Sequence, residues 1–407
     1  MIRKLIPILG ITFIDILGFS MLIPVMPYFV VHFGVSAFVV GILFSTFSLC
    51  QFISGPIWGN VSDRVGRKTV LIISQIGATI GWAMLAFAGN IFWVFVARIV
   101  EGVSGGNIGI TQAYVADLVE AKERARAFGW ISATFGAAMI FGPASAGALY
   151  ARFGFSAPFL AAAALQLLTL ILTVVLLPES RSEQEEAEAG KVGFREIFAT
   201  LHNPRLSPIL LQKLALSLAL YAWFAVIALY LKGQLGQGLV QTTEFFSAFA
   251  IVNVIINVFA VGKASESLGD VRMSVVGLAS LVIGFALVPF AHTILEVAGI
   301  MGLFAFGMAL ASNGITAQIS NASSSREQGT VLGVGSSLDS LSGIVAPPIS
   351  TGILAQYGSP FAGAASLLMA TVSLALGIRN TVRATPVLAE TEGEETTIVT
   401  EELEATP

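Results

Sequence analysis

Four ionisable side chains lie inside long apolar stretches of this 407-residue chain: Asp15, Arg98, Glu101 and Asp339. An ionisable group at the centre of a bilayer costs about 2.5–3.5 kcal/mol on insertion scales, so such groups usually face a partner or a water-filled cavity. With a helical rise of about 1.5 Å per residue, the three carboxylates lie near the middle of a roughly 30 Å hydrocarbon core. Such carboxylates can bind and release protons when their surroundings alternate between wet and dry.

Arg98 and Glu101 are three residues apart and share one helix face. One interpretation is a structural pair that cancels two charges, and the other is a proton switch. Asp15 is the first candidate for the proton carrier, and Glu101 is the second. Asp339 has two interpretations of equal weight: it binds a cationic substrate, or it accepts only local hydrogen bonds.

The composition excludes most soluble classes of protein. Apolar residues make up 55% of the chain and charged residues 11%, whereas a soluble domain carries about 25% charged residues. This excludes an ordinary soluble enzyme, a nucleic-acid binder and a disulfide scaffold, and the single cysteine, Cys50, has no internal partner. The chain contains no G-x-x-x-x-G-K-[ST] phosphate loop and its histidines lack metal-ligand spacing. We therefore expect no enzymatic activity, no metal and no cofactor, with energy supplied by a proton gradient.

A membrane-spanning helix needs about 20 largely apolar residues, and the chain contains twelve such windows. They are continuous and do not alternate, which favours helices over a barrel. The windows are 5–31, 38–59, 69–88, 92–116, 127–150, 157–177, 208–231, 243–261, 273–291, 295–319, 329–354 and 361–378. The fold class is therefore an all-α membrane protein with twelve transmembrane helices.

The loop charges predict the orientation of these helices. If both termini are cytoplasmic, 17 Lys and Arg residues lie on the inner side and two, Arg152 and Lys232, on the outer side. Lys213 lies near an inner edge, where its stem can snorkel toward water. We expect a multi-pass protein of the cytoplasmic membrane that functions as a monomer.

The chain is expected to divide into two pseudo-symmetric halves. The predicted organisation is a six-helix bundle over 1–178, a cytoplasmic linker over 179–207, a second six-helix bundle over 208–379 and an acidic disordered tail over 380–407. Gly59, Asp63 and Gly66 recur as Gly262, Glu266 and Gly269 at an offset of 203, and residues 151–154 recur as 355–358 at an offset of 204. Two matches at nearly one offset indicate duplication, an arrangement known in secondary transporters.

Four motifs resemble the major facilitator superfamily, and most closely its twelve-helix drug:proton antiporters, which include the tetracycline-efflux proteins. Residues 15–18 and 24–27 resemble that group's helix 1 signature, and residues 98–102 resemble the helix 4 motif R-x-x-x-G. Residues 59–68 match the loop motif G-x-x-x-D-R-x-G-R-K completely. Residues 142–147 resemble the antiporter motif G-P-x-x-G-G, with Ala146 in place of one glycine.

The resemblance implies roles for specific residues. The antiporter motif would be carried by Gly142, Pro143 and Gly147. A gate that latches the halves on the cytoplasmic side would use Gly59, Asp63, Arg64, Gly66, Arg67 and Asp117. Helices 1, 4, 7 and 10 line the cavity in this superfamily, and the candidate substrate-binding residues there are Phe19, Asn107, Gln112, Tyr221, Trp223, Phe224, Asn313 and Gln318.

These expectations lead to the hypothesis that the protein exports small lipophilic or cationic compounds by proton-coupled alternating access. The expected partners are the substrate, protons and the lipid bilayer, and no nucleic acid is expected to bind. Ser267 stands in the second-half loop where Arg64 stands in the first, and helix 9 has no acid in its interior. The resemblance therefore does not extend to tetracycline as the substrate. The alternatives are a nutrient or metabolite symporter or uniporter of the same superfamily, and a transceptor that does not transport.

Overall fold

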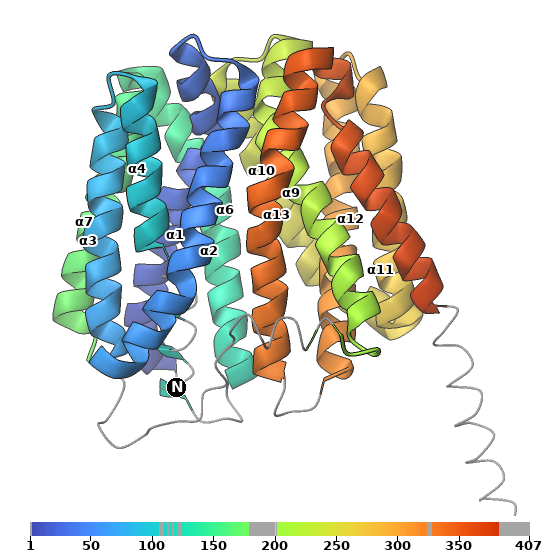
Figure 1. Ribbon diagram of the computed structural model, residues 1–407, viewed down its shortest axis with the longest axis horizontal. Coiled ribbons are helices and arrows are strands. Elements are labelled where there is room, and N and C mark those ends of the chain that lie inside the picture. The colour runs from blue at the N-terminus through green and yellow to red at the C-terminus, as the bar shows by residue number, and fades with distance from the viewer. Residues whose placement is uncertain are drawn as a thin grey trace, which may run out of the picture.

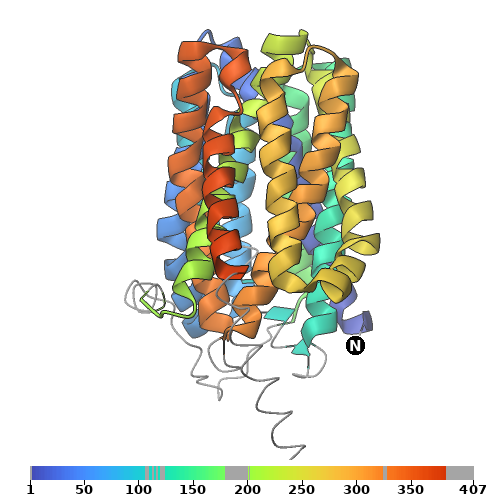
Figure 2. The same ribbon diagram turned by 90° about the vertical axis from the view of Figure 1, so that its right-hand side faces the viewer.

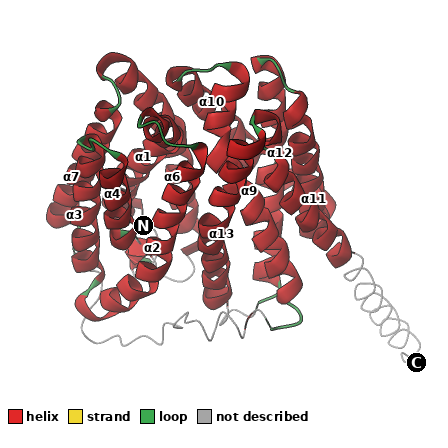
Figure 3. Cartoon of the chain, turned by 45° about the horizontal axis from the view of Figure 1, so that its top comes forward, coloured by secondary structure: helices red, strands yellow, loops and turns green. Residues whose placement is uncertain are grey.

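The computed structural model describes residues 2–105, 110–111, 114–115, 118–119, 124–178, 200, 202–323 and 328–381. Every regular element in these ranges is a helix, and short loops join the helices (Figure 3). Most of the expected linker over 179–207 and nearly all of the expected acidic tail over 380–407 lie outside the described residues.

Within its described residues, the first half contains six long helices: α1 (Ile2–His32), α2 (Ala37–Val65), α3 (Arg67–Ala86), α4 (Ile91–Ser104), α6 (Arg124–Phe153) and α7 (Ser156–Leu176). The second half contains α9 (Ser207–Leu235), α10 (Leu239–Phe259), α11 (Val261–Leu287), η2 (Val288–Phe290), α12 (Ile294–Asn321), α13 (Gln328–Tyr357), η3 (Ser359–Phe361) and a helix over 364–381. Among the described residues, eleven helices are long and apolar enough to cross a membrane, and α4 is a further helix of 14 residues. The expected all-helical fold is confirmed.

The helices run between two ends of the bundle (Figures 1 and 2). We call the end at which α1 begins the N face, and the end at which residues 33–36 join α1 to α2 the opposite face. The two halves pack together through α2 against α13 and through α6 against α10. Each of these interfaces pairs the second helix of one half with the fifth helix of the other, as expected for two halves related by pseudo-symmetry.

Backbone conformation repeats between the halves. In the described part of the chain, six glycines have a positive φ. They form three pairs at offsets of 202, 203 and 204: Gly34 with Gly236, Gly66 with Gly269, and Gly154 with Gly358. Side chains disfavour this conformation, so glycine is needed at each turn. The offset first seen in the loop motif therefore extends along both halves.

Helix starts repeat in the same way. Asn90 caps α4 by accepting a hydrogen bond from the Trp93 backbone N–H, and Thr293 caps α12 in a capping box with Glu296. These caps satisfy backbone donors that a helix start leaves without a partner. The two capping residues are 203 positions apart, so the fourth helix of each half begins at an equivalent position.

Candidate functional site

Arg98 and Glu101 form an ion pair inside the first half. Both side chains come from one face of α4, and they are only 2% and 5% exposed. Gly81 on α3 leaves room for the glutamate, since a Cβ built there would collide with the Glu101 side chain. A buried charge is retained only when a partner compensates it. The proximity expected from the spacing of three residues is confirmed.

An aromatic ring from α2 covers the arginine. The Phe47 ring centroid lies 4.1 Å from Cζ of Arg98, a cation–π geometry. The backbone of α2 approaches α4 closely here, since a Cβ built at Gly102 would lie 2.8 Å from the Phe47 carbonyl oxygen. Phe47 also lies beside Phe19 of α1, with 6.4 Å between ring centroids. The buried ion pair is thus connected through two rings to the first helix.

The first helix carries Asp15 and Phe19 one turn apart. Phe19 is 37% exposed, and Asp15 is half-buried. Because residues i and i+4 share a helix face, these two side chains lie on one face of α1. The proton-carrying role predicted for Asp15, Arg98, Glu101 and Asp339 stays a prediction.

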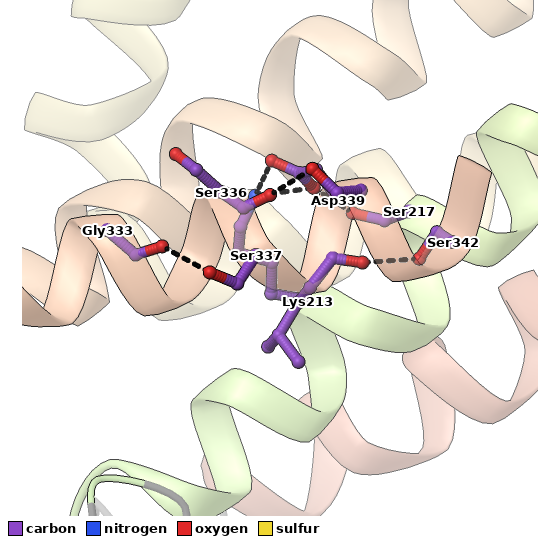
Figure 4. Close-up of polar contacts among 9 residues, drawn as sticks. Lys213, Ser217, Gly333, Ser336, Ser337, Asp339 and Ser342 are labelled. Atoms are coloured by element: carbon purple, nitrogen blue, oxygen red, sulfur yellow. Dashed lines mark hydrogen bonds and ion pairs between the residues drawn. The ribbon is translucent and has the colours of Figure 1, made fainter. Parts of the chain in front are cut away.

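Asp339 of α13 forms a second intramembrane ion pair, with Lys213 of α9 (Figure 4). The Lys213 Nζ lies 2.9 Å from both carboxylate oxygens, and the Ser217 hydroxyl donates to Oδ1 at 2.5 Å. Ser336 lies beside the pair in the same view. The sequence placed the Lys213 ammonium at a membrane edge, whereas here its side chain turns into the bundle. Asp339 is therefore bound by a neighbouring helix as well as lying among the serines of its own.

The predicted substrate residues on α9 and beyond α4 differ in their surroundings. Tyr221 is 39% exposed and Phe224 is half-buried, on the second half's first helix. Trp223 is buried in that half among Tyr230, Phe285 and Phe304. Asn107 and Gln112 lie outside the described residues.

The amides of α12 are engaged in hydrogen bonds between helices. Gln318 is buried, and its Nε2 donates to the Ser274 hydroxyl of α11 at 3.0 Å. Asn313 is exposed, and its Nδ2 donates to Oδ1 of Asn257 at 2.9 Å, while Asn257 donates in turn to Oδ1 of Asn253 at 3.0 Å. This row of asparagines joins α10 to α12. The substrate role of Asn313 stays a prediction.

The loop motif forms the turn between α2 and α3 on the N face. Gly66 has φ 97° and ψ 149°, a conformation that favours glycine. The guanidinium of Arg67 donates to the Ser62 hydroxyl at 2.7 Å, and Arg64 is exposed. Gly59 lies within α2, and no described atom comes within 4 Å of a Cβ built there. The Asp63 side chain and Asp117 lie outside what the structure describes, so the predicted latch stays a prediction.

The antiporter motif lies on α6 and contacts both halves. A Cβ built at Gly142 would lie 2.9 Å from Cβ of Ser20 on α1, and one built at Gly147 would lie 3.1 Å from Cβ of Thr243 on α10. Pro143 lies between them inside the helix. The two glycines therefore permit close packing of α6 on α1 within its own half and on α10 across the interface.

Comparison with known proteins identifies the family. The sequence profile of the Major Facilitator Superfamily matches residues 8–347 and 230–403. The chain is 30% identical to the class C tetracycline resistance protein of Escherichia coli over 91% of this chain and 95% of that protein. It is 29% identical to multidrug resistance protein 1 of Bacillus subtilis over 91% and 93%.

A solved structure shows the same fold. The human organic anion transporter MFSD10 (TETRAN) superposes with a TM-score of 0.72, at 18% sequence identity, over 92% of this chain and 99% of that chain. Together with the sequence profile, which matches most of the chain, this similarity shows that the chain belongs to the Major Facilitator Superfamily and is a multi-pass membrane transporter of a small molecule.

Proposed function

We propose that this transporter exports small lipophilic or cationic compounds in exchange for protons, by alternating access between its two six-helix halves. The named relatives confer resistance to tetracycline or to multiple drugs, which supports export of a toxic compound. The N face would be cytoplasmic, as the positive-inside distribution of Lys and Arg predicts. The protein would act as a monomer in a bacterial cytoplasmic membrane.

The observation that carries the proposal is the connection from the buried Arg98–Glu101 pair through Phe47 to Phe19. Phe19 is the exposed end of this chain of contacts, one turn from Asp15. A bulky apolar substrate packing on Phe19 would press on Phe47, and a shift of that ring would change the surroundings of the arginine and its glutamate. Substrate binding and proton binding would then influence each other, as exchange requires.

Close packing between the halves favours one conformation of the transport cycle. A Cβ built at Gly41 of α2 would lie 2.6 Å from the carbonyl oxygen of Pro347 on α13. Gly147 of α6 meets Thr243 of α10 in the same part of the bundle, toward the opposite face. Tight contact at that end is what an alternating-access transporter needs when its site opens to the N face.

The proposal can be tested with purified protein in liposomes under an imposed pH gradient. Tetracycline and the lipophilic cation tetraphenylphosphonium are suitable probes, and the internal pH is followed at the same time. We expect probe movement against its gradient, coupled to proton movement in the opposite direction, and loss of both when a protonophore collapses the gradient. Probe movement without proton flux would indicate a uniporter, co-movement of both would indicate a symporter, and either result would contradict the proposal.

A further inference from the structure

Asp339 lies on the face of α13 that turns toward the first half. Residues 339, 343 and 347 share one face of the helix, because they are spaced by four. Two of them touch α2: a Cβ at Gly343 would lie 2.7 Å from the Ser48 hydroxyl, and the Pro347 carbonyl adjoins Gly41. Asp339 is the next member of this row toward the N face, and it is 35% exposed. The carboxylate therefore lies between the halves, one turn beyond a contact that joins them.

The Lys213 ammonium, which neutralises this carboxylate, can also reach water at the N face. Lys213 is six residues from Ser207, where α9 begins on the N face, so its backbone lies about 9 Å along the helix. Asp339 lies eleven residues into α13, about 16 Å from the same face. The lysine side chain thus extends inward from a shallower position. Its flexible stem can instead snorkel toward water at the N face, as its sequence position suggests.

The surroundings of the carboxylate fit a cationic group. Tyr221 is two turns beyond Lys213 on the same face of α9, and its ring adjoins Gly343, one turn from Asp339. This ring is 39% exposed and can contribute apolar contact and cation–π attraction. Ser217 donates to Oδ1 only. The hydrogen bond described for Oδ2 comes from the Lys213 ammonium. When Lys213 leaves, this hydrogen bond is lost and Oδ2 can accept another cationic group.

We propose that Asp339 binds the cationic group of a substrate, and that the Lys213 ammonium occupies this site as a tethered competitor when substrate is absent. The inference rests on the proposed export of lipophilic cations. When substrate binds, its cation replaces the ammonium at the carboxylate, and Lys213 swings to water at the N face. The carboxylate has one positive partner before and after the exchange, so no uncompensated charge is left in the membrane. Neutral and anionic compounds cannot make this replacement.

A pair of probes of matched shape and opposite charge tests the proposal. Binding of tetraphenylphosphonium and of tetraphenylborate is measured on the purified full-length protein in nanodiscs, without a pH gradient. Lys213→Gln removes the competitor, so we expect the dissociation constant for tetraphenylphosphonium to fall about tenfold, equivalent to ~1.4 kcal/mol. Lys213→Arg keeps the positive charge and binds a carboxylate with two parallel hydrogen bonds, so the dissociation constant should rise. Asp339→Asn removes the carboxylate, so it should raise the dissociation constant for tetraphenylphosphonium at least as much as Lys213→Arg does.

Controls on the same helix separate this effect from a general change in charge. Lys232→Gln removes a lysine at the other end of α9, where its ammonium lies 5.5 Å from the Tyr28 ring, and it should leave binding of both probes unchanged. If Lys213→Gln fails to fold, the comparison of Lys213→Arg with the unchanged protein carries the test, because arginine preserves the pair.

Two results would overturn the proposal. Loss of tetraphenylborate binding in Lys213→Gln would make Lys213 the recognition group, for anions. If the folded variants of Lys213 and Asp339 bind tetraphenylphosphonium with the same affinity as the unchanged protein, the pair has only a structural role. These measurements need no transport. If the order of affinities holds but a pH gradient drives no movement, the proposed proton exchange fails and the cation site stands.

Discussion

The Phe47 ring of α2 covers the guanidinium of Arg98 on α4, with 4.1 Å between the ring centroid and Cζ. Arg98 is 2% exposed, so this contact is made away from water, where a cation–π interaction is strongest. The same ring neighbours Phe19. Phe47 therefore contacts both the exposed Phe19 and the buried guanidinium, and in the proposed cycle it would connect them.

Replacing Phe47 with leucine should weaken the coupling while the fold is preserved. Leucine keeps an apolar side chain but loses a cation–π interaction worth about 0.5–2 kcal/mol. An effect of this size changes an equilibrium by a factor of roughly 2–30, because each 1.4 kcal/mol is tenfold. We expect pH-driven probe uptake by Phe47→Leu to fall by about twofold or more. Phe92→Leu removes an exposed ring from the start of α4 and should keep normal uptake. Equal uptake by the two variants would remove Phe47 from the coupling path.

Asp15→Asn should abolish uptake driven by a pH gradient. Asparagine is nearly the same size as aspartate but does not exchange a proton, so a carrier that depends on this carboxylate loses its driving force. Exchange of labelled for unlabelled probe needs no net proton movement and should persist, which also shows that the variant is folded. Asp15→Glu retains the ionisable group and should restore part of the driven uptake. Persistent pH-driven uptake by Asp15→Asn would exclude Asp15 as the proton carrier.

Glycines of the loop motif should differ in their tolerance of alanine. Gly66 has φ 97° and ψ 149°, and its repeat partner Gly269 has φ 71° and ψ 160°. Non-glycine residues held in such regions cost about 1–3 kcal/mol each. We expect Gly66→Ala and Gly269→Ala to lower the Tm of the purified protein.

Gly59 provides the matched control in the same motif. It is helical, and a Cβ there meets no described atom within 4 Å. Alanine is favoured over glycine in a helix interior by about 1 kcal/mol, so Gly59→Ala should keep or raise the Tm. A lower Tm for Gly59→Ala than for Gly66→Ala would mean that strain at the turn is not what the motif requires.

The sequence was sufficient for the fold because its signals are local or repeated. Long apolar windows, the G-x-x-x-D-R-x-G-R-K loop and the offset near 203 follow from residue types and spacing alone. The Arg98–Glu101 pair was also predictable, since residues three apart share a helix face. Gly34 and Gly236 were present as a third repeat pair, but only their positive φ distinguishes them from the many other glycines.

Contacts between distant helices were not predictable in the same way. Lys213 and Asp339 are 126 residues apart, and the sequence alone does not tell whether a lysine near a helix end turns toward water or inward. Phe47 is one of several phenylalanines on α2, and its role depends on the close approach at Gly102. Trp223 was expected in the cavity but is buried within its half, because most residues around α9 are apolar and the periodicity of its apolar residues does not identify its exposed face.

The close contact between Gly41 and Pro347 should control which face of the transporter is closed. A Cβ at Gly41 would lie 2.6 Å from the Pro347 carbonyl oxygen, so valine there would force α2 and α13 apart near the opposite face. Packed interfaces switch between discrete arrangements instead of deforming smoothly. We therefore expect Gly41→Val to reduce the population of molecules closed at that face and to slow transport.

Spin labels at the ends of these two helices can measure that population. Ser36→Cys precedes α2 and Gln356→Cys lies near the end of α13, and Cys50→Ser removes the single native cysteine. Gly41→Val should shift the distance distribution between the labels to longer values. Gly55→Val adds the same side chain to α2 where no described atom lies within 4 Å, so its distribution should match that of the labelled parent. Unchanged distances in Gly41→Val would show that the glycine is not required for closure, because the interface would have absorbed a valine without opening.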